Sequence, residues 1–148
     1  MMLSDQGAEV IKIEQTGFGD PLRYLGTQKG GISAIFANTN RGKKSVELDL
    51  KTESDLERAK KLISEADVLI NNFRPGVMDS LGLGKDDCKT LNKNLIYVAI
   101  TGFGKEGPYA NAPAYDHVVQ AMSGSTAIQA DEDKPKYIKT LLLSLIHI

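Results

Sequence analysis

The sequence predicts an α/β protein in which helices flank a parallel sheet. Short apolar or alternating runs at residues 9–14, 45–50, 67–70 and 95–100 are typical of β-strands. Residues 53–64 place apolar side chains three and four positions apart, which predicts an amphipathic helix between the second and third runs. Strands that alternate with helical segments form parallel sheets, because each crossover returns the chain to the same end of the sheet.

The composition is that of a soluble globular chain. Hydrophobic residues make up 41% of the 148 residues and charged residues 25%, which excludes a disordered polyelectrolyte. A net charge of −1 gives no general attraction to nucleic acid or to a membrane, and no apolar run reaches membrane-spanning length. The single cysteine, Cys88, excludes an internal disulfide and favours a reducing compartment. We predict a cytoplasmic protein, with a mitochondrial location as the alternative for a eukaryotic source.

The first elements follow from short local signals. Residues 1–8 are typical of the end of a helix, with Gly7 where a left-handed cap is common. The strand at 9–14 leads into a turn at 17–21, in which two glycines, an aspartate and a proline limit the conformations. Residues 30–38 are expected to form a short helix.

Three cations surround a glycine in the segment Asn40-Arg41-Gly42-Lys43-Lys44, directly before the strand predicted at 45–50. A solvated turn explains such a run. A contact with a phosphate group is the alternative, because Lys and Arg bind phosphate oxygens well.

The stretch after the strand at 67–70 is the first candidate for a binding site. The apolar run ends in two amides, an aromatic ring, an arginine and a Pro-Gly break. In open α/β sheets, ligands bind beyond the carboxyl ends of the strands. Asn72, Phe73 and Arg74 therefore lie where a planar, cationic group could contact a ligand.

The second half of the chain repeats this pattern. Short helices are predicted at 77–81 and 85–91, followed by a strand at 95–100 and a glycine-rich loop at 101–109. A helix is predicted at 115–124. The loop is not a GxGxxG motif, and neither a P-loop nor a zinc-binding spacing occurs, so we expect no metal site.

Six segments together resemble the class III CoA-transferase family in content and order, from about Leu3 to Ile138. That family includes formyl-CoA transferase, carnitine CoA-transferase and α-methylacyl-CoA racemase. The segments are GAEVIKIE, GFGDPLR, NRGKKSVELDLK, ADVLINNFRPGVMDSLGL, NLIYVAITGFGKEGPY and APAYDHVVQAMSG.

The resemblance implies a Rossmann-like α/β domain that contributes to an interlocked homodimer. It also implies that acyl-CoA is a substrate, with no cofactor bound permanently, and that the partners are acyl-CoA and a carboxylic acid. In the transferase branch an aspartate attacks the thioester. In the racemase branch a histidine and an aspartate exchange a proton instead.

The resemblance assigns roles to residues by position. The segment that holds the adenine and ribose corresponds to Leu48, Asp49, Leu50 and Lys51. The segment that lines the CoA channel corresponds to Asn72, Phe73 and Arg74. Tyr115 and Asp116 correspond to positions beside the reacting thioester.

Several positions depart from the family pattern. Gln15 and Ser80 stand where formyl-CoA transferase has arginines. Tyr115 replaces the catalytic histidine of the racemase branch, which favours a transferase. The nucleophilic aspartate is expected a few residues after 139, yet no carboxylate side chain follows Asp133.

We therefore expect an N-terminal fragment whose sheet is incomplete at both ends. Residues 1–139 are expected to be part of the large domain, without its first strand and without the second domain. Residues 140–148 are expected to be a non-native or truncated tail.

The sequence leaves two alternatives to a transferase fragment, namely the racemase branch and a CoA-binding module without catalysis. The acyl group is also open among oxalate, carnitine, dicarboxylic acids and bile acids.

Overall fold

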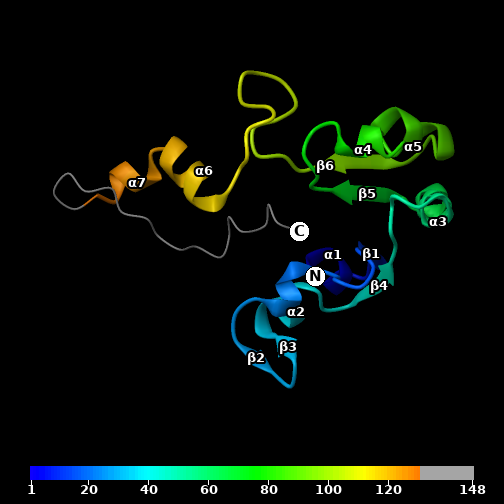
Figure 1. Cartoon of the computed structure of the whole chain (residues 1–148), viewed down its shortest axis with the longest axis horizontal. Helices are drawn as coiled ribbons and strands as arrows, with labels where there is room; N and C mark the ends of the chain where they lie inside the picture. Colours follow the sequence, from blue (N-terminus) through cyan, green and yellow to red (C-terminus); the bar gives the residue numbers. More distant parts are fainter. Residues whose placement is uncertain (131–148) are drawn as a thin grey trace. The chain divides into compact units, whose positions relative to one another are not determined.

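The structure is a computed structural model, and it describes residues 1–130 except the side chains of Asp116 and His117 (Figure 1). Helices and strands alternate along the chain, with one short 3₁₀ helix, η1. In chain order the elements are α1 (Met2–Asp5), β1 (Val10–Glu14), η1 (Pro21–Tyr24), β2 (Gln28–Lys29), β3 (Ile32–Ser33), α2 (Ala34–Thr39), β4 (Lys43–Glu47), α3 (Glu53–Glu65), β5 (Val68–Asn71), α4 (Val77–Ser80), α5 (Lys85–Leu91), β6 (Ile96–Ala99), α6 (Asp116–Met122) and α7 (Ser125–Ile128).

The chain divides into two compact units, with the boundary between Lys61 and Leu62 inside α3. The first unit contains the sheets β1–β4 and β2–β3, and the second contains β5–β6. Each unit is described by itself.

In the first unit, β1 and β4 pair in parallel, from Val10 opposite Lys43 to Glu14 opposite Glu47. The strand predicted at 9–14 is thus confirmed. The strand predicted at 45–50 is shifted, because β4 ends at Glu47 and the chain turns at Asp49. The Leu48 amide still donates to the Glu14 carbonyl oxygen at 2.9 Å, and after it hydrogen bonds within the turn replace the ladder.

A hairpin, β2–β3, interrupts the segment predicted as a helix at 30–38. Gly30 and Gly31 connect its strands with φ angles of 60° and 77°, which is the geometry of a tight hairpin turn. The prediction is therefore wrong for the first residues of that segment. The helix α2 begins only at Ala34, where the Ser33 hydroxyl accepts a hydrogen bond from the Phe36 amide.

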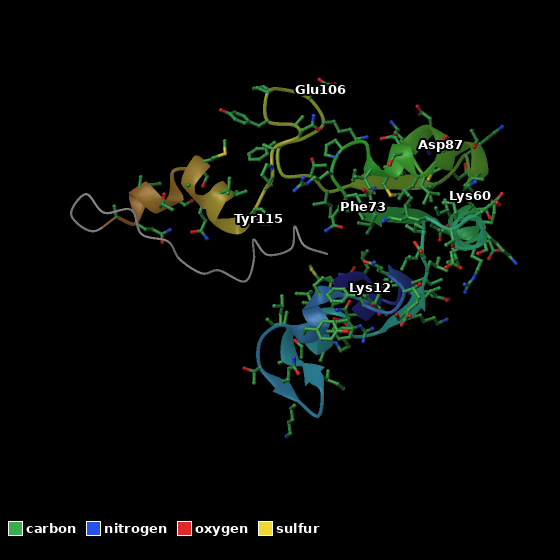
Figure 2. The ribbon with its side chains drawn as sticks, in the orientation of Figure 1. Lys12, Lys60, Phe73, Asp87, Glu106 and Tyr115 are labelled. Atoms are coloured by element: carbon green, nitrogen blue, oxygen red, sulfur yellow. The ribbon has the colours of Figure 1, made fainter. Side chains whose placement is uncertain are left out.

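A buried carboxylate, that of Glu14, joins the end of β1 to the loop after it. It accepts hydrogen bonds of 2.9 Å from the Asp20 amide and the Ser45 hydroxyl. Both Nε and a terminal nitrogen of Arg23 also donate to it at 2.9 Å. Lys12, labelled in Figure 2, pairs with Asp20 beside it. This network fixes the glycine-rich turn against the sheet.

In the second unit, β5 and β6 pair in parallel, from Val68 opposite Ile96 to Asn71 opposite Ala99. Both strands were predicted within one or two residues, and α5 has the predicted bounds. Figure 1 draws α4 and α5 beside this pair, and the Tyr97 hydroxyl donates to the Leu83 carbonyl oxygen between the two helices. The buried apolar residues in the described part of this unit are Ile63, Met78, Leu83, Cys88 and Leu95.

One face of this strand pair carries exposed apolar side chains. Val68, Ile70 and Ile96 remain 43%, 49% and 60% exposed. Because residues opposite each other in the register point to one face, these three side chains form an apolar surface. The predicted α/β class with parallel strands and flanking helices is confirmed. No helix in the described part of the chain is long and apolar enough to cross a membrane.

We predict that Gly19→Ala lowers the free energy of unfolding by about 2 kcal/mol, because φ is +69° and a Cβ would lie 3.1 Å from a Glu14 carboxylate oxygen. Gly17→Ala is the matched control. Its φ is +80°, but a Cβ there meets nothing within 4 Å. Equal losses in chemical denaturation would show that the crowding against Glu14 has no effect.

The bonds to Arg23, the largest cause, lower the pKa of Glu14 from 4.5 to about 2. Since the folded state binds this proton more weakly, the stabilisation is present above pH 4.5 and is lost as the pH falls toward 2. Arg23→Gln should therefore reduce the melting temperature at neutral pH, and the difference from the unmodified chain should shrink across this window.

The control for this titration is Arg41→Gln, which breaks a two-bond contact between Arg41 and the more exposed Asp5. Its effect should be smaller, because solvent screens exposed ion pairs. A difference between Arg23→Gln and the unmodified chain that stays constant from pH 6 to about pH 2 would contradict the assignment.

Candidate functional site

The loop after β5 carries the polar side chains that the sequence singled out. β5 ends at Asn71, and two exposed residues follow shortly after, Phe73, which is labelled in Figure 2, and Arg74. Pro75 disfavours a helical conformation for Arg74 and so directs the chain away from the strand. Gly76 then adopts a φ of +85° and is the N-cap of α4, which begins at Val77. The arginine is thereby presented beyond the carboxyl end of the strand.

The loop after β6 reaches the same edge. The Ile100 amide donates to the Asn71 carbonyl oxygen at 2.8 Å, which extends the parallel ladder by one residue. The Gly104 amide then donates to the Thr101 hydroxyl at 3.0 Å and closes a tight turn. Because parallel strands end at one edge, the two loops meet there.

A small hollow of about 20 Å³ lies between these loops. It combines an aromatic ring and two cations with a floor from the strands and α4. Its lining residues are Asn71, Phe73, Arg74, Pro75, Gly76, Met78, Tyr97, Ala99, Thr101 and Lys105.

The 101–114 loop closes on itself through Gly102. A Cβ on Gly102 would overlap the Ala114 methyl group, so the two backbones approach more closely than any other residue permits. Phe103 and Tyr109 also pack within this loop, with ring centroids 5.9 Å apart. Tyr115 follows Ala114 directly, at the start of α6. The loop closure therefore returns Tyr115 toward the end of β6, and its side chain is 44% exposed.

The other predicted site residues lie in the loop after β5, at the start of α6 and in the turn after β4. Asn72 is half-buried in the loop after β5, and Asp116 is the first residue of α6. The segment after residue 139, where the nucleophile was expected, lies outside the described residues, as does the predicted tail at 140–148.

The turn predicted to hold adenine and ribose is closed by internal hydrogen bonds and belongs to the first unit. The Asp49 amide donates to the Asp55 carboxylate at 2.9 Å, and this bond is the largest cause that lowers the pKa of Asp55. The Asp49 carboxylate accepts from the Lys51 amide at 3.1 Å. Leu48 is buried and packs in the core, whereas Leu50 is half-buried and Lys51 is exposed. The side chains available to a ligand there are thus those of Leu50 and Lys51.

The cations of the 40–44 segment all have partners. Arg41 pairs with Asp5, Lys44 with Glu9 at 2.6 Å, and the Lys43 ammonium group donates to the Asn40 side chain at 3.1 Å. The solvated-turn interpretation of this segment is therefore favoured over a phosphate contact.

A second hollow, of about 120 Å³, lies in the first unit and is lined by Arg23, Gly31, Ile32, Ser33 and Phe36. The cation in it is already neutralised, since Arg23 binds Glu14 and stacks 4.1 Å from the centre of the Phe36 ring. This hollow therefore lacks a free charge for an anionic ligand. Among the side chains that the structure describes, no group of His, Cys, Asp or Glu could hold a metal ion.

Among the lining residues that the sequence analysis did not single out, one is charged, Lys105. Lys105 was treated as part of a glycine-rich turn, yet it lines the same hollow as Phe73 and Arg74. The available signal was a cation in the second loop that follows a strand.

The fold and the hollow define an α/β protein that presents cations at the carboxyl edge of a parallel strand pair. Residues 1–145 match CoA-transferase family III, and the chain belongs to this family. The resemblance to this family found in the sequence is therefore confirmed.

Two curated relatives and one solved structure illustrate the similarity. The chain is 46% identical over 134 residues to acetyl-CoA:oxalate CoA-transferase of Acetobacter aceti, and covers 34% of that protein with 90% of its own length. It is 41% identical over 139 residues to succinate–glutarate CoA-transferase of Agrobacterium fabrum, with 89% of this chain and 35% of that protein covered.

The crystal structure of a CAIB/BAIF family protein from Brucella suis superposes with a TM-score of 0.85 at 40% identity, covering 93% of this chain and 38% of that one. The chain thus spans about a third of the length of the curated relatives it matches.

We predict that Gly102→Ala destabilises the loop by about 1–3 kcal/mol, because the added methyl overlaps Ala114. The paired change Gly102→Ala/Ala114→Gly should restore most of this loss, since it moves the methyl from one side of the contact to the other. Thermal unfolding measures the loss of stability, and the rate of trypsin cleavage after Lys105 measures the opening of the loop. Failure of the pair to restore protection would show that the loop does not close through this contact.

Proposed function

We propose that this chain is the CoA-binding part of an acyl-CoA:carboxylate CoA-transferase, an enzyme that moves coenzyme A between carboxylic acids. The observation that carries the proposal is the hollow at the carboxyl edge of β5 and β6, where Phe73 and Arg74 lie together. CoA joins a nucleobase and phosphates to a thiol. The guanidinium group suits the phosphates, and the aromatic ring offers an apolar wall to the part of CoA beside them.

The relatives support the reaction class. Their names specify CoA-transferases that act on acetyl-CoA and oxalate or on succinate and glutarate. The acids differ while CoA is common to both names. We therefore propose that this chain binds the component common to both reactions, coenzyme A, with acyl-CoA as the substrate and no permanently bound cofactor.

In this proposal each group of residues has its own role. The CoA channel is lined by Asn72, Phe73 and Arg74. The hydrogen-bonded turn that holds the adenine and ribose consists of Leu48, Asp49, Leu50 and Lys51. Tyr115 and Asp116 lie beside the thioester. Two of these three groups stand at ends of parallel strands, where α/β proteins bind ligands.

The chemistry that we propose for the whole enzyme proceeds through an aspartyl intermediate. A carboxylate attacks the thioester carbonyl carbon and the carbon–sulfur bond breaks. The CoA thiolate departs, and the acyl group and the aspartate are joined as a mixed anhydride. The thiolate then attacks the aspartyl carbonyl carbon and releases the first acid as a carboxylate. The aspartyl thioester then reacts with the acceptor acid through the same two steps in reverse, and the acceptor leaves as the new acyl-CoA. A homodimer is the proposed assembly.

This chain contains no carboxylate side chain after Asp133, the region where the resemblance puts the nucleophile. We therefore propose that the chain as given binds CoA without transferring it. Tyr115 at the position of the racemase histidine makes the proton-exchange alternative weaker, because one proton carrier is missing.

We predict that CoA binds the chain in isothermal titration calorimetry and that Arg74→Gln raises the dissociation constant about tenfold, because a charged hydrogen bond to phosphate contributes about 1.4 kcal/mol. The control Lys93→Gln removes an exposed cation at the other end of β6 and should leave affinity unchanged. Absence of CoA binding by the folded, unmodified chain would refute the proposal.

A further inference from the structure

We propose that Lys105 is a second phosphate-binding cation of this site and acts together with Arg74 on one phosphorylated part of CoA. This inference rests on the proposed function and adds a residue to it. Lys105 comes from the loop after β6 and Arg74 from the loop after β5, so the two cations approach the hollow from different strands.

The loop geometry holds Lys105 at the hollow. The Gly104 amide donates to the Thr101 hydroxyl at 3.0 Å, and Gly104 has a φ of +83°, so the chain reverses immediately before Lys105. Thr101 itself lines the hollow. Closure of the loop between Gly102 and Ala114 fixes the far end of the same segment. Lys105 is thus carried by a turn with defined internal contacts.

The charges around the hollow are not balanced within the described part of the chain. Arg74 and Lys105 form no ion pair there, although both are exposed cations. Arg23, Arg41 and Lys44, by contrast, each pair with a carboxylate, that of Glu14, Asp5 and Glu9 respectively. No acidic residue lines the hollow. Two positive charges without a local counter-ion favour an anion with more than one negative charge.

The chemistry of the two cations suits a phosphate better than a single carboxylate. Arginine binds two oxygens in a planar fork, while the lysine ammonium is a compact charge on a flexible stem. A phosphate offers oxygens on several sides and can accept from both groups. Phe73 lines the same hollow and supplies an apolar surface beside the two cations.

The test compares CoA, dephospho-CoA and pantetheine in calorimetric titrations of the full chain. Lys105→Gln should raise the dissociation constant for CoA about fivefold, and Lys105→Arg should restore it, because an exposed ionic contact contributes about 1 kcal/mol. The effect should shrink at about 0.5 M salt, since the screening length falls to a few ångströms. Lys93→Gln, at the opposite end of β6, is the matched control.

The three ligands distinguish the sources of the phosphate. If the fivefold effect persists with dephospho-CoA, Lys105 contacts the diphosphate, and if it disappears there, Lys105 contacts the 3′-phosphate; both results support the proposal. Pantetheine has no phosphate, so an equal effect on its binding would overturn the proposal.

The single and double variants separate this inference from the proposed function. Less-than-additive losses in Arg74→Gln/Lys105→Gln would show that both cations act on one group. A tenfold loss with Arg74→Gln but none with Lys105→Gln would reject Lys105 and leave the proposed function standing. No CoA binding by the unmodified chain would reject both.

Discussion

The parallel pairing of β5 with β6 is the constraint on which the candidate site depends. The ladder runs in one direction from Val68 opposite Ile96, and the bond from the Ile100 amide to the Asn71 carbonyl oxygen carries it to the last residue. Both strands therefore end at one edge, and residues about thirty positions apart are brought to a single hollow. Had the strands run antiparallel, the loops that carry Arg74 and Lys105 would leave from opposite edges.

The first unit uses its charges differently. Glu14 is buried at the end of β1, and every bond it accepts ties a loop or a neighbouring strand to the sheet. Arg23 completes this arrangement and also covers Phe36. A buried carboxylate with several donors is stable only while all of them remain, so these side chains are committed to the fold. The charges left over for a ligand are then those of exposed turns and loops.

Local signals in the sequence predicted most of the elements. α5 and the strands β1, β5 and β6 follow from periodicity and β-branched runs that need no distant partner. The β2–β3 hairpin was missed because its signal is a Gly30-Gly31 pair between very short strands, which also fits a loop. β4 was placed too late because alternation continues through Leu48 while the bonds of Asp49 end the strand. Phe73 and Arg74 were found from the sequence, whereas Lys105 was missed because its place at the hollow depends on how the 101–114 loop closes, although a cation in a loop after a strand was a local signal.

The buried thiol of Cys88 gives this molecule an internal reporter. Its sulfur donates to the Leu83 carbonyl oxygen, and burial raises its pKa, so the closed structure keeps it protonated and shielded. It is also the only cysteine in the sequence. Alkylation kinetics therefore measure how often α5 separates from its strands, without an introduced label. A ligand that holds β5 and β6 together would slow the alkylation of Cys88. The alkylation rate of this buried thiol would therefore measure the occupancy of the site.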